Sequence, residues 1–461
     1  MDTSKINDII SSQKFFLDSK SNTIESRILL LKKLLINIQL FEEEIYEALS
    51  KDLGKAKFES FLTEILLVEK EIKLFIKNLN RWSKDKKVKA SILNFPSKNY
   101  LKPEPYGKVL IITPWNYPFQ LSLTPLIGAF SSGNTVVIKP SELAPNTSSV
   151  LSRLLRETFP ENIVSVIEGD AEVSKNLLSK KWDYIFFTGS TRVGKIVASE
   201  AAKNLTPITL ELGGKSPCII DKGINVEKAA KRIVSGKFIN CGQTCIAPDY
   251  ILVNDEIKSK LIDYLKIEIV KTYGNKPNQS NDYGRIISKN HLDRLTNIIT
   301  GQNIVFGGHS NKDDKYIEPT LIIDPDINSS IMSEEIFGPI LPIISYNDVK
   351  EIEKVILKNP NPLAFYIFSN NKKFIDHLIN NFSFGGCVIN DTLIHYINSN
   401  LPFGGIGNSG MGAYRGKHSF DTFSHYKPIL KKQSFFLDHL RFGPHPNPKS
   451  FNTLKKILSK F

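Results

Sequence analysis

The sequence predicts an α/β fold in which helices cover parallel sheets, and it predicts more than one domain. At 461 residues, the chain exceeds the size at which a single hydrophobic core keeps growing. From Gly107 onward, short apolar runs alternate with helical segments, which is typical of βαβ units. After Leu212 the alternation begins again, which predicts a second α/β domain with a sheet of its own.

The elements of the first domain follow from the spacing of apolar residues. Steps of three and four over residues 24–49 and again over 61–79 predict amphipathic helices. Four apolar runs predict buried parallel strands at 108–113, 135–138, 163–167 and 184–187. The helices expected between and after them cover residues 119–132, 145–159, 171–178 and 192–205.

The second domain is expected to begin after a stretch marked by a proline and paired glycines, near residues 207–214. Strands are predicted at 217–221 and 250–253, and helices at 226–238 and 257–271.

Composition narrows the class of protein. The four cysteines are too few for a disulfide framework, and the eight dispersed histidines give no metal-ligand spacing, so we expect no metal. The net charge of +13 comes mostly from scattered lysines without interleaved aromatic residues, so we expect no nucleic-acid partner. The N-terminus is polar, and no apolar run approaches the ~20 residues of a membrane span, so we expect a cytoplasmic protein.

Two cysteines lie in residues 240–245, between a predicted helix and a predicted strand. A thiolate is the best side-chain nucleophile near neutral pH, and a connection of this kind can present one on a rigid scaffold. Taken alone, the segment fits two small buried apolar side chains as well.

Two further segments contain groups suited to acyl chemistry. Glu211 lies between leucines and precedes two glycines, and burial there would raise its pKa toward that of a general base. Asn116 is bracketed by two prolines in a stiff loop, where a rigidly held amide can donate to an oxyanion. A salt-bridged glutamate and a structural turn are the alternative interpretations.

Two strand ends are suited to a nucleotide. Residues 187–194 run from a strand through Gly-Ser-Thr into a helix, whose first N–H groups favour a pyrophosphate. The spacing differs from the usual glycine fingerprint, so an ordinary βα turn is an alternative. The strand over residues 137–139 is followed by Glu142, which could bind ribose hydroxyls or belong to a solvated strand end.

These five segments occur in the order typical of the aldehyde dehydrogenase superfamily, and residues 334–339 and 401–410 supply two more of its motifs. Each motif is weak alone, but seven in order over nearly the whole chain make the resemblance specific. The chain resembles most the class 3, fatty-aldehyde-dehydrogenase-like branch, on residues 115–117, 243–250 and 408–412.

The resemblance implies an aldehyde dehydrogenase fold with a Rossmann-like cofactor domain, an α/β catalytic domain and a small β oligomerisation arm. The NAD(P)-binding domain would comprise residues 1–80 and 106–208, and the catalytic domain residues 209–390. Residues 81–105 and 391–430 would form the bridging arm and the C-terminal closing segment, followed by a basic tail at 431–461. A homodimer is expected from the same resemblance.

The resemblance also implies the chemistry. Cys245 would attack the aldehyde carbon, Asn116 and the backbone N–H of Cys245 would stabilise the oxyanion, and Glu211 would activate the water that hydrolyses the thioester. Glu335 is a rival base, although its commoner role in the family is to bind the nicotinamide ribose. The cofactor-binding residues would be Trp115, Lys139, Glu142, Thr188, Gly189, Ser190, Gly194, Glu335 and Phe337. Glu142 should repel a 2′-phosphate and favour NAD, but class 3 relatives that keep this glutamate can use NADP as well.

Several alternatives stay open from the sequence. The class 3 features favour medium- or long-chain aliphatic or aromatic aldehydes, whereas a charged semialdehyde is a rival substrate. A non-catalytic binding protein on this scaffold is a more remote alternative. In the tail, Leu454, Ile457, Leu458 and Phe461 share one helical face beside lysines, which predicts either a weak membrane contact or packing against the protein itself.

Overall fold

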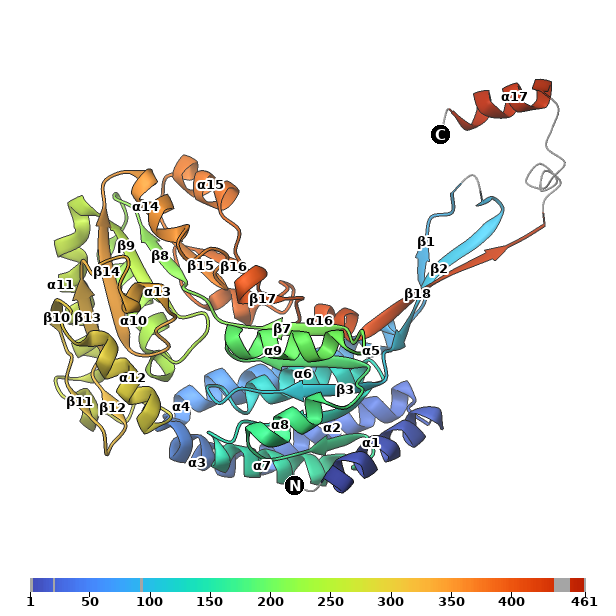
Figure 1. The fold of residues 1–461 in the computed structure, drawn as a ribbon, viewed down its shortest axis with the longest axis horizontal. Coiled ribbons are helices and arrows are strands. Elements are labelled where there is room, and N and C mark those ends of the chain that lie inside the picture. Colours follow the sequence, from blue (N-terminus) through green and yellow to red (C-terminus); the bar gives the residue numbers. More distant parts are fainter. Residues whose placement is uncertain (1–2, 20, 92–93, 435–447, 460–461) are drawn as a thin grey trace.

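The computed structural model describes residues 3–19, 21–91, 94–434 and 448–459. This part of the chain contains a six-stranded sheet and a seven-stranded sheet, each flanked by helices, and a three-stranded arm that projects from the body (Figure 1). Neighbouring strands are parallel throughout the centre of both large sheets. The prediction of an α/β fold with parallel sheets is confirmed.

The six-stranded sheet has the order β17-β7-β6-β3-β4-β5. Its strands are β3 (Lys108–Ile112), β4 (Thr135–Lys139), β5 (Val164–Val166), β6 (Tyr184–Thr188), β7 (Ile208–Glu211) and β17 (Gly410–Met411). The four strands predicted before residue 190 agree with β3 to β6 within two residues at either end. β7 pairs in parallel with β6, and its residues Thr209 and Leu210 are buried. The first sheet therefore extends beyond residue 208, where the sequence predicts the end of the NAD(P)-binding domain.

Alternate residues of these strands face two different apolar cores, which explains why the strands are continuous apolar runs. Val109 and Ile111 of β3 belong to a large core that also contains residues of the seven-stranded sheet. Leu110 and Ile112 face a smaller core on the other side, together with Ile185 of β6.

Helices cover both faces of this sheet. They are α1 (Thr3–Asp18), α2 (Ile24–Leu40), α3 (Glu42–Leu53), α4 (Lys57–Ser60), α5 (Leu66–Trp82), α6 (Gln120–Ser131), α7 (Pro145–Thr158), α8 (Ala171–Leu178) and α9 (Thr191–Ala202), with a π-helical turn at Phe61–Ile65 between α4 and α5. The apolar stripe over residues 24–49 is divided into two helices at Phe41. α1 was not expected from the sequence; it buries Ile6 and Ile9, and the Gln13 amide donates to the carbonyl of Val136 at 3.0 Å.

The seven-stranded sheet has the order β10-β13-β14-β9-β8-β15-β16. Its strands are β8 (Pro217–Ile220), β9 (Tyr250–Asn254), β10 (Ile304–Phe306), β13 (Thr320–Ile323), β14 (Ile340–Tyr346), β15 (Ala364–Phe368) and β16 (Gly386–Ile389), with a separate hairpin of β11 (Ser310–Asn311) and β12 (Tyr316–Ile317). The helices of this part are α10 (Val226–Phe238), α11 (Lys258–Tyr273), α12 (Lys289–Ile299), α13 (Ser330–Ser333), α14 (Val349–Ile356) and α15 (Lys372–Asn381). The predicted second sheet is therefore present, with the elements expected over residues 217–271.

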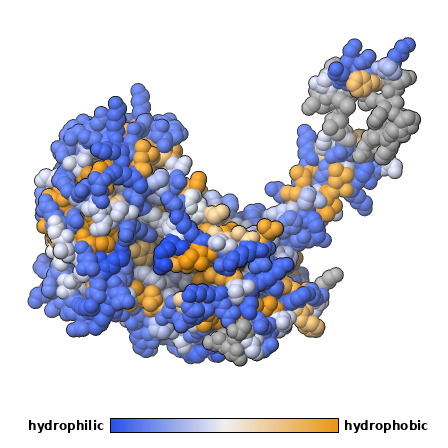
Figure 2. All heavy atoms as spheres, in the orientation of Figure 1, coloured by the Kyte–Doolittle hydropathy of each residue, from blue (hydrophilic) through white to orange (hydrophobic). Residues whose placement is uncertain are grey.

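The projecting arm consists of β1 (Lys86–Val88), β2 (Ser97–Pro105) and β18 (Ser424–Lys432). β18 follows α16 (Lys417–Thr422) and pairs antiparallel with the whole of β2. Apolar side chains gather on the surface of the arm (Figure 2), where Val88 and Leu430 are exposed.

The C-terminal segment contains α17 (Pro448–Leu458), in the region where the sequence predicts an amphipathic tail. The side chains of Leu454, Ile457 and Leu458, and Phe461 altogether, lie outside the described residues. Among the helices described, none has the length and apolar character that crossing a bilayer demands.

Candidate active site

Functional side chains gather at the carboxyl end of the six-stranded sheet. Trp115 and Asn116 follow β3, Glu142 follows β4, Thr188 ends β6, and Glu211 ends β7. Because these parallel strands are neighbours in the sheet, their carboxyl ends share one edge, where α/β folds bind ligands.

The loop that carries Cys245 is rigidly shaped. Asn240, Cys241 and Gly242 have left-handed φ angles of 51°, 54° and 73°, which let the chain turn sharply after α10. A Cβ on Gly242 would lie 2.3 Å from the carbonyl oxygen of Gly338, so only glycine allows the two loops to approach this closely. Cys241 is buried, whereas the side chain of Cys245 is partly accessible.

The side chain of Gln243 fixes the same loop to residues beyond it. Its amide nitrogen donates to the carbonyls of Asn240 and Arg285, both at 3.0 Å. Its amide oxygen accepts the N–H of Ile287 at 2.9 Å. The loop is therefore held before any ligand binds.

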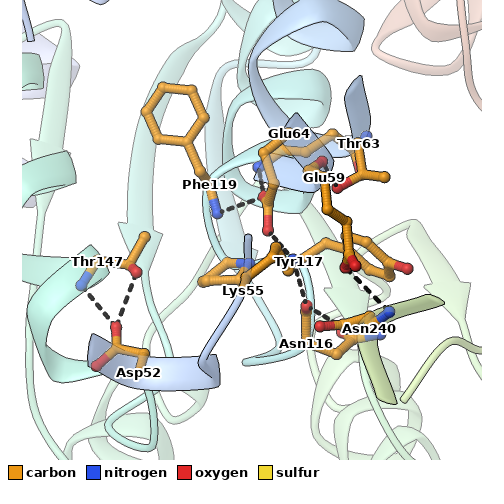
Figure 3. A network of polar contacts seen from close by, with 12 residues as sticks. Asp52, Lys55, Glu59, Thr63, Glu64, Asn116, Tyr117, Phe119, Thr147 and Asn240 are labelled. Carbon is orange, nitrogen blue, oxygen red and sulfur yellow. Dashed lines mark hydrogen bonds and ion pairs between the residues drawn. The ribbon is translucent and has the colours of Figure 1, made fainter. Parts of the chain in front are cut away.

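Asn116 lies directly against the cysteine loop. It is buried, and its side-chain amide donates to the carbonyl of Gln243 at 3.0 Å. The Asn240 amide donates to the backbone oxygen of Asn116 at 2.8 Å (Figure 3). The hydroxyls of Tyr117 and Thr244 lie 2.6 Å apart, which brings the residue after Asn116 to the residue before Cys245.

Glu211 is a buried carboxyl group without a hydrogen-bonding partner among the described residues. Burial raises the pKa of Glu211 well above its usual range, because the apolar surroundings disfavour the charged form of the carboxyl group. Its backbone carbonyl accepts the N–H of Gly189 at 3.0 Å, which ties the base position to the turn after β6.

Glu335 approaches the site from the other sheet. A Cβ on Gly213 would lie 1.9 Å from a carboxylate oxygen of Glu335, so this glycine makes room for the glutamate. Burial raises the pKa of Glu335 to about 8, and the charge of Asp249 adds to the effect. Burial also raises the pKa of the Cys245 thiol, and negative charge on Glu335 or Glu211 raises it further. The three groups are thus electrostatically coupled.

The loop of Glu335 is held by a buried ion pair that the sequence did not indicate. Lys215 Nζ lies 2.6 Å from Asp249 Oδ2, and the same amine donates to the carbonyl of Glu334 at 2.9 Å. The other oxygen of Asp249 accepts the N–H of Ile336 at 3.1 Å. Asp249 and the loop are 87 residues apart in the chain, so no local pattern could reveal this support.

Aromatic rings form one wall of the site. Trp115 packs edge-to-face against Phe337, with centroids 5.3 Å apart, and His291 lies 5.7 Å from Trp115. His291 also bonds the carbonyl of Phe337 through Nε2 at 2.8 Å. Burial lowers the pKa of His291 to about 4, so the ring is neutral at physiological pH. His291 was missed in the sequence, where it is an isolated histidine.

The predicted nucleotide-binding residues form a second group along the same sheet edge. Ser190 caps α9, with its hydroxyl accepting the N–H of Val193 at 3.4 Å. A Cβ on Gly194 would lie 2.6 Å from Leu212, so glycine lets the first turn of α9 pack against the strand end. The buried Thr188 hydroxyl has no partner among the described residues. An open helix N-terminus beside an unpaired hydroxyl fits a pyrophosphate.

Lys139 and Glu142 complete this group. Lys139 is buried, and its Nζ lies 2.5 Å from a carboxylate oxygen of Glu142, which is half exposed. An exposed carboxylate after a strand of this sheet can accept bonds from ribose hydroxyls, and it would lie close to a phosphate on the same ribose. Among the residues described, no group of three or more histidines, cysteines and acidic residues is placed to hold a metal ion.

Comparison with known proteins agrees with this geometry. The aldehyde dehydrogenase family model matches residues 3–429. The chain is 50% identical, over 95% of both chains, to 4,4'-diaponeurosporen-aldehyde dehydrogenase of Staphylococcus aureus. It is 44% identical to aldehyde dehydrogenase family 3 member H1 of Arabidopsis thaliana, over 95% of this chain and 91% of that one.

Among solved structures, a substrate-bound state of Staphylococcus aureus AldH superimposes with a TM-score of 0.94 and 48% identity, covering 98% of this chain and 99% of that one. The resemblance to the class 3 branch inferred from the sequence is confirmed. The chain belongs to the aldehyde dehydrogenase family, and it oxidises aldehydes with NAD or NADP as cofactor.

Proposed function

We propose that the chain oxidises medium- or long-chain apolar aldehydes to carboxylic acids through a thioester on Cys245. The observation that carries the proposal is the meeting of a partly accessible thiol, a rigid amide and an unpaired buried carboxyl group in one site. Relatives named as a family 3 aldehyde dehydrogenase and as 4,4'-diaponeurosporen-aldehyde dehydrogenase support the proposal.

In the first half of the reaction, Cys245 loses its proton and attacks the aldehyde carbon as the thiolate, which gives a thiohemiacetal oxyanion. The Asn116 amide and the backbone N–H of Cys245 donate to the developing oxyanion, a contribution that in other enzymes is worth about 10²–10³ in kcat per donor. A nicotinamide cofactor, when bound, would supply the hydride acceptor. As the oxyanion collapses, the C–H bond of the former aldehyde carbon would break, its hydride would pass to this acceptor, and the acyl group would remain on Cys245 as a thioester.

In the second half, Glu211 removes a proton from a water molecule, which attacks the thioester and releases the acid. Because the pKa of Glu211 is raised by burial, the group is a strong base once it is ionised, and the rate should rise with pH. Glu335 is the rival base, since the pKa of Glu335 is also raised, to about 8. We favour Glu211, because the Glu335 carboxylate already has the backbone of Gly214 as a hydrogen-bond partner, whereas the Glu211 carboxylate has none among the described residues.

For the cofactor, the proposal assigns the nicotinamide ribose to Glu335 beside Phe337 and Trp115, and the pyrophosphate to the turn of Thr188, Gly189, Ser190 and Gly194. Lys139 and Glu142 would contact the adenosine ribose. The carboxylate of Glu142 favours NAD over NADP, because a 2′-phosphate would lie against it.

NADH formation from hexanal and decanal tests the assignment, with wild type, Cys245→Ala and the matched control Cys241→Ala. Activity lost only in Cys245→Ala supports the nucleophile, and the ratio of the two aldehydes measures the chain-length preference. Full activity in Cys245→Ala would overturn the mechanism. Turnover of a charged semialdehyde in place of both alkanals would overturn the proposed substrate class, and failure with every aldehyde would favour a non-catalytic scaffold.

Assembly and location extend the proposal. The arm of β1, β2 and β18 would join two subunits in a homodimer, since it projects from the body and exposes Val88 and Leu430 (Figure 2). Leu430→Glu should then convert the dimer to a monomer in size-exclusion chromatography with light scattering. A cytoplasmic location is proposed, because all four cysteines are free thiols, which is usual in a reducing compartment.

The basic tail would add a weak contact with an anionic membrane, where long-chain aldehydes partition. Sedimentation with anionic liposomes tests this, comparing the full chain with one that ends at residue 444. Equal pelleting of the two would refute the contact.

A further inference from the structure

A cluster of buried charged side chains lies behind the two active-site loops, outside every motif of the sequence. Lys55 and Glu64 have no exposed side-chain surface, and Lys55 Nζ lies 2.7 Å from a carboxylate oxygen of Glu64. Glu59 precedes the π-helical turn at Phe61–Ile65 and lies close by (Figure 3). π-Helical turns occur frequently at functional sites.

Glu64 fixes the far end of the loop that contains Asn116. One oxygen of its carboxylate accepts the N–H groups of Phe119 at 3.2 Å and Gln120 at 2.8 Å, where α6 begins. A negative charge at a helix N-terminus is stabilising, and these two bonds connect Glu64 to the point where the Asn116 loop ends and α6 begins.

Lys55 acts on Asn116 itself. Its Nζ lies 3.4 Å from the backbone oxygen of Asn116, the same oxygen that accepts from the Asn240 amide. The amine also lies 4.3 Å from the centre of the Tyr117 ring, whose hydroxyl meets Thr244. The backbone oxygen of Asn116 therefore accepts from two donors, the Lys55 amine and the Asn240 amide.

Glu59 holds the start of the cysteine loop. Its carboxylate accepts the backbone N–H of Asn240 at 2.9 Å, at the first of the left-handed residues. Burial raises the pKa of Glu59 to about 7. The titratable groups that face it are Lys55, Glu64, Tyr117, Cys241, Tyr273 and Asp282.

We propose that Lys55, Glu59 and Glu64 are positioning residues, which hold the Asn116 amide and the Cys245 loop in one fixed relation. Buried ion pairs are a poor source of stability, because desolvation offsets the attraction, so their value lies in defining geometry. All three side chains end on the Asn116 loop or on Asn240. The inference rests on the proposed roles of Asn116 and Cys245.

A double-mutant cycle in the full-length enzyme tests whether Lys55 acts through Asn116 or stabilises the protein independently of it. Lys55→Met, Asn116→Ala and the double variant are compared by kcat for decanal oxidation and by hydrolysis of p-nitrophenyl acetate. We expect Asn116→Ala to lower kcat by about 10²–10³ and Lys55→Met by about 10- to 100-fold, because a small misplacement of a catalytic group is costly. If Lys55 acts through Asn116, the double variant should be no slower than Asn116→Ala alone.

Lys57→Met is the matched control, since Lys57 is exposed and its amine lies on Glu43 at the surface. It should leave kcat unchanged. If the fold losses in kcat of Lys55→Met and Asn116→Ala multiply in the double variant, the two residues act independently, and the positioning role of Lys55 is overturned. An unchanged kcat in Asn116→Ala would instead refute the proposed oxyanion donor, so the two failures are distinguishable.

Glu59→Gln provides a second test if Lys55→Met does not fold. Glutamine keeps an oxygen for the Asn240 N–H but stays neutral, so it resembles the protonated glutamate. The ratio of wild-type to variant kcat should be near one below about pH 6 and rise through about pH 7, since the ionised carboxylate is the stronger acceptor. Glu59→Asp keeps an ionisable carboxylate, so its kcat should change with pH in the same way as that of wild type. A ratio that does not change with pH would contradict the role of Glu59.

Discussion

Replacing Asp249 by asparagine should both loosen the loop that carries Glu335 and lower the free energy of unfolding of the protein. Asp249 and Lys215 are both buried, with their charged atoms 2.6 Å apart. Removing one partner leaves the other charge uncompensated in the interior, which costs about 3–5 kcal/mol. Lys237 should increase the cost of losing the Asp249 charge. Its buried amine has no partner among the described residues, and Asp249 is the main charge that favours its protonated form.

The variant should show a lower urea midpoint and a higher KM for NAD, because Asp249 and Lys215 hold the backbone of Ile336 and Glu334 beside the proposed ribose contact. Unfolding is followed by fluorescence and by loss of activity in the same samples. The double variant Lys215→Met with Asp249→Asn removes both charges and should recover part of the lost free energy. If Asp249→Asn lowers the free energy of unfolding by less than about 1 kcal/mol, or if the double variant recovers none of the loss, the proposed role of the ion pair is refuted.

Three further predictions concern the site itself. Glu335→Gln should speed alkylation of Cys245 by iodoacetamide above pH 8, where wild-type Glu335 is ionised and raises the pKa of the thiol, and should have no effect near pH 6; an equal effect at both pH values would contradict the coupling. Glu142→Gln should raise kcat/KM for NADP relative to NAD by about tenfold, or ~1.4 kcal/mol, in steady-state kinetics, and an unchanged ratio would place the 2′-phosphate elsewhere. Gly242→Ala should cost about 2–5 kcal/mol in urea unfolding and lower kcat, since its φ is +73° and its Cβ would meet Gly338; a midpoint equal to that of wild type would show that the loops can separate.

The sequence predicted those elements whose signals are local. The helices over 171–178 and 226–238 begin and end as predicted, because Asp170 and Asn225 cap them and the apolar stripes are regular. α1 was missed, since its few buried residues become meaningful only through a contact with Val136, 123 positions away from Gln13.

The same limit applies to the site. The residues that would perform chemistry could be found, because each lies in a short segment with a recognisable order along the chain. The residues that hold them could not be found. Lys55, Asp249 and His291 are ordinary in their local sequence, and each reaches the site through a contact with a backbone group more than 40 residues away.

The short strand β17 has a consequence for the order in which the site matures during synthesis. Gly410 pairs with Glu211, and the carbonyl of Ser409 accepts the N–H of Leu212 at 3.1 Å. Because the chain is made from its N-terminus, β7 is an uncovered edge until this late segment has emerged from the ribosome. The edge of the first sheet is therefore closed only late in synthesis, and until then β7 offers an open strand edge on which another chain could pair.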